Sequence, residues 1–311
     1  MTAPVTLDNG ILRISLTPSL GGTITSLRHL PSGAEVLART SWPTLTDPLA
    51  LAPDEATWLT RFPGGWPVMF PNAGNACEDG LIHHGFHGEG SVSPWEADQN
   101  DHRLILTRRF RAVPVTMTRR ITLTGNRVEV AEVVTADGPC TVVWGQHVTF
   151  GGDLLIGPAT LKTSATQLAA CPSYAPPASP LIPGATGAWP CLPGHHGPVD
   201  IGHPPEGAAL LACLMDLGPT PWASLSRADG LSVRLDWTAD PWPLAWFWVE
   251  TGGTTEPPWN GQNRMIAIEP CTTWPATGLA AARAAGAPVL PLAAGETRHA
   301  SISLTVIPSG L

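Results

Sequence analysis

One carboxylate and two histidines occupy positions where a polar side chain needs either a function or a partner. Glu269 lies in the run Ile266–Pro270, which alternates like a β-strand and is apolar on both sides of the carboxylate. Burying an unpartnered carboxylate there would be costly. His84 lies in a segment rich in histidine and glycine, and His147 ends another strand-like run. A carboxylate and two imidazoles at strand ends indicate an acid–base site.

The residues that flank these three side chains favour the same interpretation. Pro270 restricts the backbone of Glu269 to extended conformations, which fixes the direction of the carboxylate. Apolar surroundings raise the pKa of a carboxyl group and make it a usable base near neutral pH. The alternative for Glu269 is burial against an arginine such as Arg264. For His147, a structural role and a functional role carry about equal weight.

Three histidines, His83, His84 and His87, lie close enough in the sequence to suggest a metal site. However, no acidic or cysteine side chain follows them at helical spacing, and Gly85 and Gly88 would break a helix that aligned them. The histidines could instead form hydrogen bonds within the loop, or one of them could bind or act on a ligand. His84 is the best candidate for the second role. We therefore expect no metal.

The composition narrows the class of protein. The 311 residues carry a net charge of -8 and no basic tail, which argues against a nucleic-acid partner. The six cysteines form no CxxC pair, no apolar run has transmembrane length, and the N-terminus lacks the pattern of a signal peptide. These features predict a cytoplasmic protein with reduced thiols and no membrane partner. Cys171 and Cys191 could pair only if the chain were secreted.

Strand signals dominate the sequence. The 34 prolines and 32 glycines, together with 43% apolar residues, fit many short strands joined by tight turns. Strands are expected at 5–7, 11–16, 23–27, 104–110, 115–123, 128–134, 140–144, 208–215, 231–237, 244–249, 265–268 and 300–307. One short helix is expected at 279–285. Residues 40–80 and 171–206 have no regular pattern and predict long loops.

We interpret residues 1–311 as one all-β domain, a large antiparallel β-sandwich with long loops at one rim. The strands expected between 104 and 134 carry an arginine cluster, with members from Arg108 to Arg120. Such a cluster usually lies on a solvent-exposed sheet face. The more specific hypothesis is a phosphate-binding site.

The order of short motifs along the chain resembles the aldose 1-epimerases, the galactose mutarotase-like proteins. The resemblance covers roughly residues 5–307. It rests on Gly21-Gly22, Phe70-Pro71-Asn72, His84-Gly85-Phe86, His147 after a mid-chain strand, Ile268-Glu269-Pro270 and Gly295-Glu296.

This resemblance implies a β-supersandwich that interconverts the α and β anomers of a free aldose without a metal or an organic cofactor. It implies that Glu269 removes the proton of the anomeric hydroxyl and that His147 protonates the ring oxygen. It also implies that His84 binds and polarises the sugar near that oxygen. Ring opening itself needs such a pair, because one proton leaves the C1 hydroxyl while another reaches the ring oxygen.

The chain departs from the family where sugar hydroxyls are held. Family members usually carry an arginine directly after Phe-Pro-Asn, and here that place is Ala73-Gly74-Asn75. We expect substitute contacts from Asn75, Gln146, Trp66 and Trp259. Asp236 is a candidate for the family's sugar-binding aspartate.

The sequence therefore predicts a mutarotase whose partner is a monosaccharide and which is a monomer or a homodimer. A carbohydrate-binding protein without turnover is the first alternative, because the arginine is missing. A hexose-phosphate epimerase, suggested by the arginine cluster, is the second.

Overall fold

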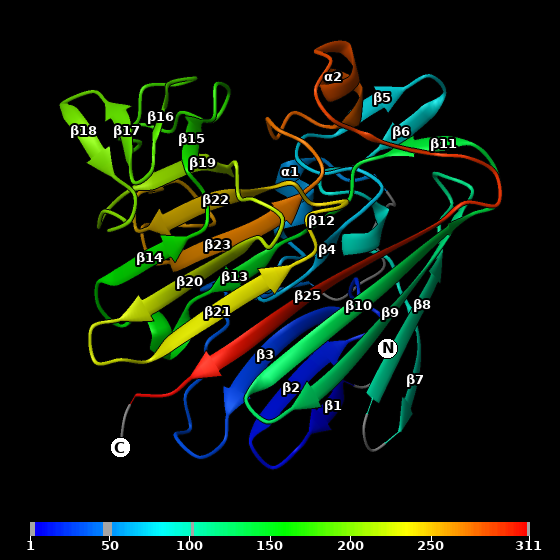
Figure 1. The fold of residues 1–311 in the computed structure, drawn as a ribbon, viewed down its shortest axis with the longest axis horizontal. Coiled ribbons are helices and arrows are strands. Elements are labelled where there is room, and N and C mark those ends of the chain that lie inside the picture. Colours follow the sequence, from blue (N-terminus) through cyan, green and yellow to red (C-terminus); the bar gives the residue numbers. More distant parts are fainter. Residues whose placement is uncertain (1–3, 46–51, 101–102, 310–311) are drawn as a thin grey trace.

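The computed structural model describes residues 4–45, 52–100 and 103–309, and it consists almost entirely of antiparallel β-strands (Figure 1). Two large sheets form the body of the fold. Sheet I has the order β14 (Ala159–Thr163), β20 (Trp222–Arg227), β21 (Ser232–Trp237), β25 (Thr297–Ile307), β10 (Arg127–Ala136), β9 (Val115–Thr124), β8 (Arg103–Arg109) and β7 (Glu96–Asn100). Sheet II has the order β16 (Thr186–Ala188), β15 (Gln167–Ala170), β19 (Ala209–Met215), β22 (Leu244–Thr251), β23 (Arg264–Cys271), β12 (Gly145–Gln146) and β4 (Val68–Met69). A further strand, β13 (Val148–Phe150), also pairs with β23.

Smaller elements surround the two sheets. β1 (Val5–Asp8), β2 (Leu12–Thr17) and β3 (Thr23–His29) form a separate sheet. The remaining strand pairs are β5 (Cys77–Asp79) with β6 (Ile82–His84), β11 (Cys140–Val142) with β24 (Leu290–Leu292), and β17 (Cys191–Gly194) with β18 (Gly197–Asp200). The α-helices are α1 (Glu55–Leu59) and α2 (Leu279–Ala284), and the 3-10 turns are η1 (Glu89–Ser91) and η2 (Gly152–Leu155).

The all-β prediction is confirmed, and most expected strands lie within a few residues of their predicted bounds. The helix expected at 279–285 is α2. Two differences concern the segments predicted to be loops. The stretch 171–206 contains β16, β17 and β18, and the stretch 40–80 contains α1, β4 and β5. Asp54 caps α1 by accepting a hydrogen bond from the Thr57 backbone N–H. These elements are short and lack apolar periodicity, so the sequence carries no signal for them. Residues 46–51 of the second stretch lie outside the described residues.

All six cysteines are free. Across the described ranges, no helix is long and apolar enough to cross a membrane.

Sheet II is apolar on both faces because its strands bury alternate residues on opposite sides. In β23, Ile266 and Ile268 belong to the main core between the sheets, whereas Cys271 packs on the other face. β22 alternates in the same way, with Phe247 in the main core and Trp246 on the far side. Strands covered on both faces read as nearly continuous apolar runs. The far face of sheet II is therefore a second buried layer.

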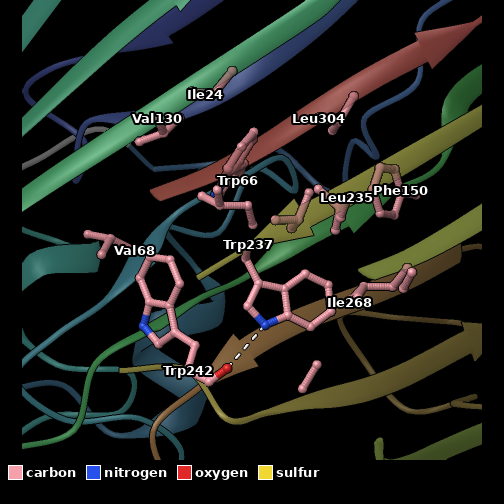
Figure 2. Packing of buried hydrophobic residues seen from close by; sticks show 14 of the residues in the cluster. Ile24, Trp66, Val68, Val130, Phe150, Leu235, Trp237, Trp242, Ile268 and Leu304 are labelled. Carbon is pink, nitrogen blue, oxygen red and sulfur yellow. Dashed lines mark hydrogen bonds between the residues drawn. The ribbon is translucent and has the colours of Figure 1, made fainter. Parts of the chain in front are cut away.

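The main core fills the space between the two sheets (Figure 2). Figure 2 shows Leu304 of β25 and Leu235 of β21 on the side of sheet I, and Ile268 of β23 on the side of sheet II. Tryptophans occupy the layer between them. The Trp237 indole N–H donates a hydrogen bond of 3.1 Å to the Trp242 carbonyl, so this large ring is buried without an unsatisfied donor.

A polar network crosses this apolar core and joins the two sheets. Arg119 of β9 stands directly opposite Glu132 of β10, and its Nε donates to Glu132 Oε1 at 2.6 Å. The other carboxylate oxygen accepts from Trp144 Nε1 and Gln146 Nε2, each at 2.8 Å. Trp66 Nε1 completes the network by donating to Gln146 Oε1 at 2.9 Å. All five side chains are buried, and we call this set of hydrogen-bonded residues the intersheet network.

The solvated-face interpretation of the arginine cluster is therefore wrong for two of its members. Arg119 is fully buried, and Arg108 forms an ion pair with buried Glu89. Arg120 is exposed, as is Arg109, which forms an ion pair with Asp137. Neighbouring residues of a strand point to opposite faces of the sheet. Because of this alternation, arginines that are close in sequence do not form a single surface patch.

We predict that Glu132→Gln lowers the free energy of unfolding by about 3–5 kcal/mol, because the Arg119 guanidinium then stays buried without a counter-charge. Glu129→Gln is the matched control, since Glu129 is exposed on the same strand. It should change the free energy of unfolding by less than about 0.5 kcal/mol. Urea unfolding of both variants measures the difference, and equal effects would contradict a stabilising role for the network.

Candidate active site

The far face of sheet II carries a pocket of about 300 Å³, at the small end of the range for ligand sites. Loops that follow or precede several strands cover this face, and α1 contributes one wall. The lining residues are Glu55, Trp58, Leu59, Phe62, Gly74, Asn75, Phe86, His87, His147, Cys171, Ser173, Tyr174, Pro176, Leu211, Trp246, Trp248, Thr254, Trp259, Glu269 and Ala276. Aromatic rings and apolar side chains make up most of the lining, as expected for a site that takes a small organic molecule.

Glu269 points into this pocket because of its place in the strand ladder. It pairs with Trp246 of β22 and shares the face of Cys271, two residues further along β23. The residue is 2% exposed, and its carboxyl group makes no hydrogen bond within the described part of the chain. Arg264, the alternative partner considered from the sequence, instead forms an ion pair with Glu206. The carboxylate is therefore buried without an arginine.

His147 is the basic group nearest to this carboxylate. Its Nε2 lies 3.8 Å from Glu269 Oε1, and its Nδ1 lies 2.8 Å from the Thr149 hydroxyl. His147 lies between β12 and β13, and its backbone N–H donates to the carbonyl of Pro67, the residue before β4. This hydrogen bond holds His147 in register with β4. Gln146 of the intersheet network precedes it directly. The position of the imidazole therefore depends on contacts on both faces of sheet II.

Burial shifts the pKa values of Glu269 and His147 away from the ordinary values of these side chains. Desolvation raises the pKa of Glu269 to about 8. Desolvation also lowers the pKa of His147 to about 4, although a backbone hydrogen bond opposes it. Both shifts favour the neutral form. Between about pH 4 and pH 8 the pair therefore holds one proton, and in the empty pocket that proton lies on Glu269.

His87 is the third polar group at this point of the pocket. Its ring centroid lies 5.2 Å from that of His147. Its Nδ1 accepts a hydrogen bond of 3.1 Å from the Gly74 backbone N–H, so the neutral ring carries its proton on Nε2. Desolvation, followed by the charge of His147, holds the pKa of His87 well below its usual value. His87 is thus a neutral hydrogen-bond donor in this site.

The structure places His87, rather than His84, beside His147. His84 ends β6 and lines a separate pocket together with Glu89 and Arg111. The His-Gly dipeptide occurs twice, at 84–85 and 87–88, and the sequence gives no means of choosing between them. The backbone explains the choice: a Cβ at Gly88 would lie 2.5 Å from the Phe70 carbonyl oxygen. The first dipeptide contacts the same segment only through its carbonyl, since Asn72 Nδ2 donates to the Gly85 oxygen at 2.9 Å, and a Cβ at Gly85 would meet Ala52 Cα instead of Phe70.

The three neighbouring histidines, for which the sequence predicts no metal, lie in different surroundings. His83 is exposed and forms an ion pair with Glu78. Across residues 4–45, 52–100 and 103–309, no group of three or more His, Cys, Asp or Glu side chains could hold a metal ion.

Two of the expected sugar contacts line the pocket, and three do not. Asn75 and Trp259 are lining residues. Gln146 and Trp66 are fully buried in the intersheet network, so they support the site from behind. Asp236 lies on β21 of sheet I, where it forms an ion pair with Arg234. It is not a lining residue of the pocket.

Most aromatic lining residues were not expected from the sequence. Trp246 and Trp248 alternate along β22 with core residues, and this period of two is the signal that could have placed them on one face. Trp58 and Phe62 come from α1 and the residues after it, where no sequence pattern identifies a helix. In the segment after Phe70-Pro71-Asn72, position 74 accepts no side chain, because a Cβ at Gly74 would lie 2.1 Å from the Ala276 carbonyl oxygen.

The pocket has no cationic wall. No lysine or arginine is among its lining residues, whereas the carboxylates of Glu55 and Glu269 are. The Asn75 amide is exposed at the mouth and is the polar group nearest in sequence to the missing arginine. Electrostatics therefore favour a neutral or cationic ligand over an anionic one.

The chain has the galactose mutarotase-like fold, as the sequence resemblance predicts. The Slr1438 protein from Synechocystis sp. PCC 6803 superposes with a TM-score of 0.69 at 16% identity, covering 98% of this chain and 96% of that protein. A candidate aldose 1-epimerase from Escherichia coli K12 gives a TM-score of 0.69 at 16% identity, with 98% and 99% coverage.

A galactose mutarotase related enzyme from Lactobacillus acidophilus gives a TM-score of 0.63 at 15% identity, with 99% and 98% coverage. No protein-family model matches the sequence, and no curated protein matches it either. The likeness is therefore one of fold over the whole chain at very low sequence identity.

We predict that Glu269 makes the protein less stable as pH rises. The unfolded carboxyl loses its proton near pH 4.5, whereas the folded one keeps it until about pH 8, so the unfolded state is favoured between these values. Between pH 6 and pH 8 the loss is about 2 kcal/mol.

Glu269→Gln should abolish this part of the pH dependence, and urea unfolding of both proteins at the two pH values measures it. The contribution of His147 cancels in the comparison, because both proteins contain it. Parallel changes in the two proteins would show that Glu269 is not protonated in the folded state.

Proposed function

We propose that this protein is an aldose 1-epimerase that interconverts the α and β anomers of a monosaccharide. The observation that carries the proposal is the buried pair of His147 and Glu269, 3.8 Å apart in an aromatic-lined pocket. A carboxylate and an imidazole that share one proton are the acid–base set that ring opening needs. The fold shared with mutarotase-like proteins agrees with this function.

In the proposed reaction the two groups move one proton each. Glu269 takes the proton from the C1 hydroxyl, the C1–O5 bond breaks with its electron pair going to O5, and His147 gives its proton to O5. The open aldehyde then rotates about the C1–C2 bond. The reverse steps close the ring on the other face of the carbonyl and return both protons.

Substrate binding prepares the pair for these roles. A sugar hydroxyl that donates to Glu269 stabilises the carboxylate, and a ring oxygen that accepts from His147 stabilises the imidazolium. The shared proton therefore shifts from Glu269 to His147 when the sugar enters. His87 donates its Nε2 proton towards the same oxygen as a neutral group, so it polarises O5 without competing for the proton.

We predict that Glu269→Gln and His147→Ala each lower kcat for anomer exchange by about 10²–10⁴-fold. His87→Ala should lower kcat/KM by at least about 10-fold, because it removes one hydrogen bond to the sugar. His84→Ala is its matched control and should leave exchange unchanged, since His84 lies outside the pocket. NMR saturation transfer between the anomers of a panel of aldoses measures these rates.

If no sugar in the panel exchanges faster with the folded wild-type protein, the proposed activity is wrong. The second candidate is a carbohydrate-binding protein on the same fold, which the missing arginine favours. Calorimetry would then detect sugar binding without faster exchange. A hexose-phosphate epimerase has no support from the pocket, because no arginine or lysine lines it.

The pH dependence of kcat/KM should be bell-shaped, with limbs near pH 4 and pH 8. Below about pH 4 both members of the pair are protonated and no base remains, and above about pH 8 both are deprotonated and no acid remains. The nearby His87 and Cys271 stay neutral between these limbs, because burial lowers the pKa of His87 and raises that of Cys271 to about 12. A profile with a limb near pH 6.5 would instead indicate an ordinary, solvated histidine.

A further inference from the structure

Three aromatic rings beside His147 offer carbon surfaces to the pocket. The ring of Phe62 lies 5.4 Å from that of His147, measured between centroids, and the rings of Trp58 and Trp248 lie 6.1 Å and 6.3 Å away. Trp58 and Phe62 are also stacked on each other at 4.7 Å. These rings form a continuous surface that we call the aromatic wall, consisting of Trp58, Phe62 and Trp248.

The indole N–H groups of this wall are not free to bind a ligand. Trp58 Nε1 donates to the Ser91 hydroxyl at 2.9 Å. Trp248 Nε1 donates to the Tyr174 hydroxyl at 3.2 Å. Both tryptophans therefore present only ring carbon to the pocket. Phe62 has no polar atom in its side chain, so the wall cannot satisfy a hydroxyl placed against it.

The chemistry of ring opening decides which part of the sugar meets this wall. With O5 bonded to His147 and the C1 hydroxyl bonded to Glu269, the ring atom on the other side of O5 is C5. The substituent of C5 is thus the sugar group closest to His147 and to the rings around it. This step rests on the proposed function, because the reaction sets the orientation of the ring.

We propose that the pocket selects neutral aldoses whose C5 substituent is apolar, with 6-deoxyhexoses as the substrate class. A C6 methyl packs on the aromatic wall and gains from leaving water. A C6 hydroxyl would lose its water without gaining a partner from the wall, which costs enough to lower affinity by about 10- to 100-fold. A C6 phosphate or carboxylate is excluded more strongly, since no cation lines the pocket.

Glu55 is the acidic lining residue contributed by the same helix as Trp58. It lies one helical turn before Trp58 on α1 and lines the same pocket. Its carboxylate repels anionic sugars and adds to the charge selectivity. It is exposed at the solvent side of the helix, whereas Trp58 and Phe62 are buried, so the wall itself remains apolar.

Matched sugars that differ only at C6 provide the test: galactose, 6-deoxygalactose, galactose 6-phosphate and galacturonate, with the corresponding glucose series. Anomer exchange measured by NMR should give a kcat/KM about 10- to 100-fold higher for each 6-deoxy sugar than for its parent. The phosphates and uronates should show no acceleration. Equal or higher kcat/KM for the parent hexoses would overturn the proposal.

Phe62→Tyr tests the wall directly, because it adds one hydroxyl to a ring of the same shape. It should reduce the preference for the 6-deoxy sugar over its parent by about 10-fold, and an unchanged ratio in the folded variant would count against the proposal. If this variant does not fold, the wild-type comparison of matched sugars decides alone.

Failure of the proposed activity remains distinguishable from failure of this specificity. If no sugar is exchanged, saturation-transfer difference NMR on the same sugars reports which protons contact the protein. The strongest transfer to the C6 methyl, with weaker binding of the parent hexose, would support the specificity without turnover. Equal binding of the two sugars would overturn it.

Discussion

The buried pairing of Arg119 with Glu132 is the interaction on which the arrangement of the site depends. Two opposite charges inside an apolar core are stable only when every remaining hydrogen-bonding position is filled. Here Trp144 and Gln146 donate to the second carboxylate oxygen of Glu132, and the Gly22 carbonyl and Gln146 Oε1 accept from the Arg119 guanidinium. Trp144 and Gln146 belong to sheet II or to the segment that enters it. The network therefore fixes the distance between the sheets. Because His147 follows Gln146 directly, it also fixes the point from which the imidazole enters the pocket.

On the far face of sheet II, desolvation, and not an ion pair with an arginine, sets the protonation states of the buried groups. Glu269 has no arginine beside it, and closed aromatic surroundings shift its pKa and that of His147 in opposite directions. The two buried polar sites thus work in opposite ways. The intersheet network satisfies its charges and stabilises the fold, whereas the pocket leaves the Glu269 carboxyl group without a hydrogen-bond partner, and burial keeps that group neutral up to about pH 8. Unsatisfied groups of this kind are stability costs that functional sites commonly carry.

Much of the fold could be predicted from the sequence because strand periodicity is a local property. The runs that became β9, β10, β22 and β23 alternate or are continuously apolar, and the hairpin turn at Asp8-Asn9-Gly10 uses residues suited to such turns. Segments such as β16–β18 and α1 were not predicted, because they are short and contacts from the rest of the molecule stabilise them. For the site, Glu269 and His147 stand out in the sequence as polar residues inside apolar strands, and the structure brings them together.

The sequence by itself determined the all-β class, most long strands and the two polar residues that face each other in the pocket, since each depends on the pattern of a few neighbouring residues. Only the tertiary structure showed that His87, and not His84, lies beside His147, because the two His-Gly dipeptides differ in what their glycines pack against. It also decided that Gln146 and Trp66 support the site from the core and that Asp236 lies on the other sheet. These outcomes depend on which face of a strand meets which partner. Pairing across distant segments sets that relation, and no local pattern encodes it.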